Sequence, residues 1–134
     1  MSRVYLIAAD KPLSLCDRRE ERTAIVGKYT VSALCGLHVM EHHYYRDAVD
    51  RLKLPMKPNQ YELQLECNSR DLDALRDYLT EQCACGESVE LWSLWVGDDS
   101  EPRPVRCQGN LSDFDMDALQ QFFTAQQICI TITI

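Results

Sequence analysis

The chain of 134 residues is predicted to form one α+β domain, a two-layer sandwich. We expect a mixed or mostly antiparallel sheet of about five or six strands, with three helices mainly on one face. In several segments apolar residues recur at every second position, the period of a strand with one buried face. In others they recur at the three- and four-residue spacing of an amphipathic helix. No internal repeat or linker divides residues 1–134, so a single domain is expected.

The first third of the chain is predicted to hold a central strand, a loop and a β-hairpin. Residues 4–9 (VYLIAA) are apolar on both faces, as in a strand that is covered on both sides. Residues 10–22 are mostly polar and are expected to form a loop. Residues 23–32 follow as two β-prone runs separated by Gly27 and Lys28, a pair that suits a two-residue hairpin turn.

The second arm of this hairpin is predicted to continue as a long strand and then to give way to a helix. From Tyr29 to Val39 apolar residues occupy every second position, which favours a strand with one buried face. Apolar residues at helical spacing then run from Tyr45 to Leu52, and Pro55 stops them. The change of period places the helix start at about residues 41–43.

The middle of the chain alternates between the same two periods. Residues 61–67 and 89–96 are predicted strands, and residues 68–82 form a predicted helix with Asn68 or Ser69 as its N-cap. Residues 97–110 are expected to be a long loop with a short strand near Val105.

The C-terminal part is predicted to pack a helix onto a strand. Ser112 and Asp115 have the spacing of a capping box, which marks a helix start. The last residues, 128–134 (ICITITI), alternate without interruption and carry no charge, so they must pair within the sheet. Their isoleucines, Ile128, Ile130, Ile132 and Ile134, are expected to face Leu119, Phe122 and Phe123 of the preceding helix.

The net charge of −7 is concentrated in the second half of the chain. Residues 1–67 carry ten Lys and Arg against nine Asp and Glu, whereas residues 68–134 carry four against twelve. A nucleic-acid-binding surface is therefore not expected, and a basic protein partner is favoured. Asp98, Asp99 and Glu101, in the acidic loop 97–110, are the candidate binding residues.

Cysteine usage and the N-terminal segment predict a reducing compartment. The seven cysteines form no Cys-x-x-Cys pair, and their odd number argues against a disulfide framework. The apolar run near the N-terminus is too short for a signal peptide, and no run is long enough to cross a bilayer. A cytoplasmic protein without a membrane partner is expected.

All three histidines, His38, His42 and His43, lie close together in the sequence. Residues 38–42 (HVMEH) match a zinc-protease signature that requires a single helix face. Here the strand period runs through Val39, so the motif is split between a strand and a helix start.

Acids at alternate positions in residues 113–117 (DFDMD) are better explained by a helix N-terminus than by a calcium loop. No metal or cofactor is expected.

The strongest catalytic pattern is formed by Cys16 and Arg22, which stand in Cys-x5-Arg spacing soon after the first predicted strand. The arrangement resembles the phosphate loop of tyrosine phosphatases, and the chain length resembles the low-molecular-weight phosphatases and arsenate reductases. The resemblance implies a nucleophilic Cys16 and a phosphate-binding Arg22. However, the intervening residues include no glycine, and their carboxylates, Asp17, Glu20 and Glu21, oppose a bound phosphate.

Two classes of function remain. The favoured one is a non-enzymatic protein-binding module, either an immunity- or antitoxin-like inhibitor or a self-associating accessory protein. Its partner would be a basic protein or a second copy of the chain. The alternative is a small cysteine-dependent enzyme that uses Cys16 and Arg22.

Overall fold

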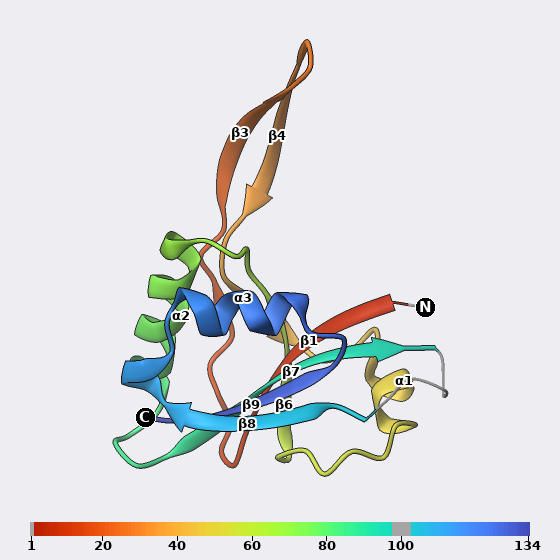
Figure 1. Ribbon diagram of the computed structural model, residues 1–134, viewed down its shortest axis with the longest axis vertical. Helices are drawn as coiled ribbons and strands as arrows, with labels where there is room; N and C mark the ends of the chain where they lie inside the picture. Colours follow the sequence, from red (N-terminus) through yellow and green to blue (C-terminus); the bar gives the residue numbers. More distant parts are fainter. Residues whose placement is uncertain (1, 98–102) are drawn as a thin grey trace.

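The computed structural model describes residues 2–97 and 103–134 and shows a seven-stranded sheet from which a separate two-stranded sheet projects (Figure 1). The strand order of the large sheet is β2-β5-β6-β1-β7-β9-β8. Its neighbours are antiparallel except β8 and β9, which are parallel. The predicted α+β class and mixed sheet are confirmed, but the sheet has more strands than expected. The strands are β1 (Ser2–Ala9), β2 (Cys16–Asp17), β3 (Glu20–Val26), β4 (Tyr29–Cys35), β5 (His38–Glu41), β6 (Asn59–Gln64), β7 (Ser88–Val96), β8 (Val105–Asn110) and β9 (Ile128–Thr133). The helices are α1 (Arg46–Asp50), α2 (Ser69–Gln82), α3 (Met116–Thr124) and a 3-10 helix, η1 (Leu111–Asp113).

The centre of the sheet is β1, which pairs with β6 on one side and with β7 on the other. The pairing with β7 covers the whole of β1, from Ser2 opposite Val96 to Ala9 opposite Val89. Both faces of β1 are buried, which is why its sequence is apolar at consecutive positions, as predicted.

Helices α2 and α3 cover one face of the sheet. The buried core on this face joins Ile7 of β1 and Leu91 of β7 to Leu75 of α2 and Phe122 of α3. Ile128, Ile130 and Ile132 of β9 also belong to it, which confirms the predicted wall of isoleucines.

The opposite face has a second, smaller core. Leu6 of β1 and Trp92 of β7 are fully buried there, and Val49 of α1 packs against them together with Leu52 and Met56. Two of the three helices therefore lie on one face, and α1 with the segment after it covers part of the other. The predicted two-layer sandwich is not confirmed, because both faces of the central strands are apolar and α1 packs on the face opposite α2 and α3.

The predicted single strand from Tyr29 to Val39 is wrong, because the strand is interrupted at Gly36, between β4 and β5. Gly36 has a φ of 138°, and a Cβ atom there would lie 2.9 Å from the carbonyl oxygen of Arg18. Only glycine fits this crossing of two backbone segments. The predicted loop at residues 10–22 is also wrong in part, since it contains β2 and the start of β3.

Helices α2 and α3 begin at capping side chains, whereas α1 has no side-chain cap. Of the two predicted N-cap candidates, Asn68 caps α2, accepting a hydrogen bond from the Asp71 N–H at 2.8 Å. Helix α3 starts later than expected, at Met116, because Asp115 rather than Ser112 is its N-cap. Helix α1 also starts later than predicted, at Arg46.

The burial pattern predicts which isoleucines stabilise the fold. Ile7 is fully buried, whereas Ile25 in β3 is 79% exposed. Ile7→Ala should lower the free energy of unfolding by about 2–5 kcal/mol, because it removes buried methyl groups and leaves a cavity. Ile25→Ala should change it by less than about 0.5 kcal/mol. Urea unfolding of both variants measures the difference, and equal losses would contradict the assignment of Ile25 to a segment outside the core.

Candidate interaction site

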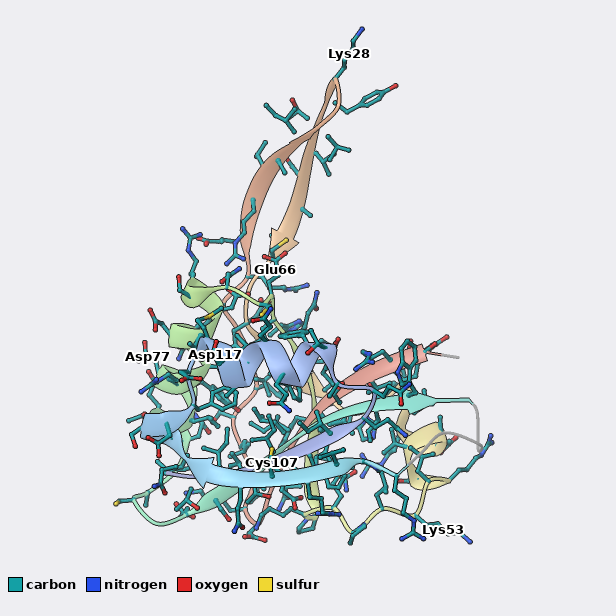
Figure 2. The ribbon with its side chains drawn as sticks, viewed as in Figure 1. Lys28, Lys53, Glu66, Asp77, Cys107 and Asp117 are labelled. Carbon is teal, nitrogen blue, oxygen red and sulfur yellow. The ribbon has the colours of Figure 1, made fainter. Side chains whose placement is uncertain are left out.

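Strands β3 and β4 form a hairpin that stands away from the rest of the molecule, and we call residues 20–35 the arm (Figure 1). Its two strands pair in register from Glu20 opposite Cys35 to Val26 opposite Tyr29. Gly27 and Lys28 form the turn, and the φ of 62° at Gly27 explains the glycine. Figure 2 shows Lys28 at the far end of the arm and Glu66 where the arm meets the body.

The arm carries most of the exposed large apolar side chains in the described part of the chain. There are eight such residues, and five of them lie on the arm, so the exposed apolar surface is concentrated there. They are Ile25 (79% exposed), Val26 (61%), Tyr29 (77%), Val31 (46%) and Leu34 (58%).

The two faces of the arm differ in polarity. Residues directly opposite each other in an antiparallel pair share a face, and the faces alternate along the strands. One face is mixed: it carries Ile25 and Leu34 together with Thr23 and Ser32, whose hydroxyl oxygens lie 3.2 Å apart. Beyond Arg22 the other face is entirely apolar, with Ala24, Val26, Tyr29, Val31 and Ala33.

An ion-pair network fixes the base of the arm to the start of α2. The guanidinium of Arg22 donates to Asp71 Oδ1 at 2.9 Å and to Glu66 Oε2 at 2.7 Å. Asp71 is only 1% exposed, and its second carboxylate oxygen accepts from the Glu66 N–H at 2.7 Å. Glu20, two residues before Arg22 on the same strand, pairs with Arg70 of α2. The hydrogen bond to Asp71, followed by that to Glu66, raises the pKa of Arg22.

A second fixed point lies where the chain enters and leaves the arm. The Arg18 N–H donates to the Leu37 carbonyl at 2.8 Å, and Gly36 crosses close to the same segment. Arg18 also pairs with Glu81 of α2 at 2.8 Å. The base of the arm is thus held by backbone and side-chain contacts, whereas its outer half projects away from the other elements in the described part of the chain (Figure 1).

The predicted catalytic pair has a different setting from a phosphate loop. Cys16 lies in β2 and packs against the core beneath α2, whereas Arg22 lies in β3. The segment between them runs from one sheet to the other, and the guanidinium of Arg22 is engaged by carboxylates. The candidate binding residues Asp98, Asp99 and Glu101 lie outside the described residues.

The histidines mark the end of β5 and the approach to α1. His38 lies in β5 and His42 follows the strand directly, so the motif does not lie on one helix face. Among residues 2–97 and 103–134, no cluster of three or more His, Cys, Asp or Glu side chains is arranged to hold a metal ion. The His42 imidazole is buried, with its Nδ1 atom 3.6 Å from Glu62 Oε1. Burial lowers the pKa of His42, and the nearby carboxylate of Glu62 opposes this effect only in part.

Sequence reasoning missed the exposure of the arm. Its alternation of apolar and small polar residues was interpreted as one buried face, because a strand has the same period whether or not anything covers it. The signals that mark it are Gly36, which separates it from β5, and the scarcity of charge, since Lys28 is the only charged residue between Thr23 and Cys35.

Comparisons with models of protein families, with curated proteins and with solved structures find no match to this chain. No helix in the described part of the chain is long and apolar enough to cross a membrane.

The buried imidazole predicts a pH-dependent stability. Because the pKa of His42 is lower in the folded state than its ordinary value of about 6.5, the unfolded state binds more protons below that pH. This contribution to stability should be fully present above about pH 7 and should decrease as the pH falls below about 6.5. In His42→Gln the difference in unfolding free energy between pH 7.5 and 5.5 should shrink, and in the exposed control His43→Gln it should not. An equal pH dependence in both variants would contradict a neutral, buried His42.

Proposed function

We propose that the chain is a non-enzymatic protein-binding module whose contact element is the arm, residues 20–35. The observation that carries this proposal is the group of five large, exposed apolar side chains on a hairpin that the base holds away from the core. Val26, Tyr29 and Val31 lie on one face of the hairpin, and Ile25 and Leu34 lie on the other. Exposed apolar side chains gathered on one element are costly in water, and in natural proteins they mark contacts with other molecules.

The chemistry of the arm favours an apolar, strand-mediated contact. Beyond Arg22 the only charge is that of Lys28, so long-range electrostatic attraction contributes little. Among the described residues, strands β3 and β4 pair only with each other, so no strand of this part of the chain lies against the outer edge of either. Unpaired strand edges bind extended segments through backbone hydrogen bonds, and adjacent apolar side chains add affinity.

Two further features support the kind of protein-binding module that the sequence predicts. All seven cysteines, each within the described part of the chain, are free thiols, which suits a reducing compartment such as the cytoplasm. The acidic second half keeps the body highly charged while the arm is nearly neutral. Both an inhibitor of the immunity or antitoxin type and a self-associating accessory protein would use such an arm.

The alternative, a cysteine-dependent enzyme, receives less support. It requires Arg22 to bind an anion, and the guanidinium of Arg22 already binds the carboxylates of Asp71 and Glu66. A thiol-reactivity profile in which Cys16 alone reacts rapidly would favour this alternative.

Site-specific photo-crosslinking tests the proposed function. A benzophenone amino acid would replace Tyr29 on the arm, and in a matched control Tyr44 on the body, in cells that naturally make this chain. The two positions are comparably exposed, at 77% and 83%. We expect a discrete crosslinked product from position 29 only, identified by mass spectrometry. No product at position 29, or the same products from both positions, would contradict the proposal.

A further inference from the structure

The outer edge of β4 offers backbone groups that the hairpin does not use. In a hairpin with a two-residue turn, the flanking pair, here Val26 and Tyr29, is hydrogen-bonded, and bonding alternates along the strands. Val31 and Ala33 therefore direct their N–H and C=O groups toward β3. Thr30, Ser32 and Leu34 direct theirs away from it, toward the open edge.

This edge lacks the features that normally prevent strands from pairing. From Tyr29 to Cys35 the strand contains no charged residue and no proline, and its pairing with β3 is continuous without a bulge. The outer edge of β3 differs, because Glu20, Glu21 and Arg22 occupy its inner half. Pairing through β3 would bring these charges against apolar residues, whereas pairing through β4 would not.

We infer that the partner of the arm is a second copy of this chain, bound through antiparallel pairing of the two β4 strands about a twofold axis. This inference rests on the proposed function of the arm. The strand is complementary to itself: an axis at Ser32 places Val31 of one copy opposite Ala33 of the other, and Tyr29 opposite Cys35. No charged residues then oppose each other, and such isologous contacts are the commonest in homo-oligomers.

The pairing would also stabilise the arm. A two-stranded hairpin is marginally stable in water, and three or more strands are needed for an independently stable sheet. Two paired arms form a sheet of four strands. Because the arm projects beyond the body (Figure 1), antiparallel pairing leaves the two bodies at opposite ends of this sheet.

The charges agree with this arrangement. The tip of each arm, which carries Lys28, comes to lie near the base of the other. The charged side chains there include the carboxylates of Asp17, Glu20, Glu21, Glu66, Asp71 and Glu81, which outnumber the guanidiniums of Arg18, Arg19, Arg22 and Arg70.

Sedimentation velocity of the full chain tests this inference with two matched variants. Thr23 and Ser32 are directly opposite each other on the hairpin, and each directs its N–H to an outer edge, that of β3 or that of β4. Proline at either position removes that outward donor, which strands tolerate at an open edge, and both substitutions remove the same hydroxyl contact between Thr23 and Ser32. We expect the wild type and Thr23→Pro to sediment at twice the 15.5 kDa mass of one chain, and Ser32→Pro to sediment as a folded monomer.

Lysine substitutions at the same positions cover the case in which proline disturbs the arm. Ser32→Lys should dissociate the dimer, because it places a charge on the paired edge, and Thr23→Lys should not.

A wild type that is monomeric at about 100 μM, or dissociation by the Thr23 variants, would overturn the inference. If the wild type is monomeric but position 29 crosslinks to a different protein, the proposed function stands and the second copy is excluded. If there is neither a dimer nor a crosslink, both fail.

Discussion

The arm depends on one buried charge pair, the contact between Arg22 in β3 and Asp71 in α2. Asp71 is almost completely inaccessible, and a buried carboxylate without a partner is strongly unfavourable. Arg22 satisfies one carboxylate oxygen and the Glu66 N–H satisfies the other, so the start of α2 and the base of the arm are joined by a single group. The network also fixes the direction in which the arm leaves the body.

Two parts of the molecule follow different physical rules. In the body, β1 and β7 are buried on both faces and helices or loops cover them, so its stability comes from apolar burial. In the arm the same types of side chain, valine, isoleucine, leucine and tyrosine, remain in contact with water. These side chains would become buried only when a partner covers them. The stability of the body does not depend on their burial.

The sequence predicted the body well because burial imposes periodicity. The apolar run of residues 4–9 identified the central strand, Asn68 identified the start of α2, and the alternation of residues 128–134 identified β9. The β3–β4 turn was also predicted, from Gly27 and Lys28. The exposure of the arm was not predicted, because alternating apolar residues indicate that a segment is a strand but do not indicate what covers it. The close crossing of Gly36 and Arg18 joins residues far apart in the sequence, which local patterns do not report.

The same limit applies to the candidate catalytic pair. The spacing of Cys16 and Arg22 specifies a phosphate loop only if the intervening residues form one turn. In this fold they pass from β2 into β3, and Arg22 pairs with Asp71 of α2 and with Glu66, which precedes that helix. The sequence singled out Arg22 as a candidate phosphate-binding residue, whereas its guanidinium here binds carboxylates at the base of the arm.

Residue-resolved amide hydrogen exchange of the arm, measured at a concentration where the chain is monomeric, tests the central claim most directly. The account predicts that the Val31 and Ala33 amides exchange slowly because they are bonded to β3, whereas the Ser32 amide between them exchanges rapidly. Arg22→Met should abolish this alternation by releasing the base of the arm. If Val31 and Ala33 of the wild type exchange as fast as Ser32, the arm is not a formed hairpin held by its base, and the account is wrong.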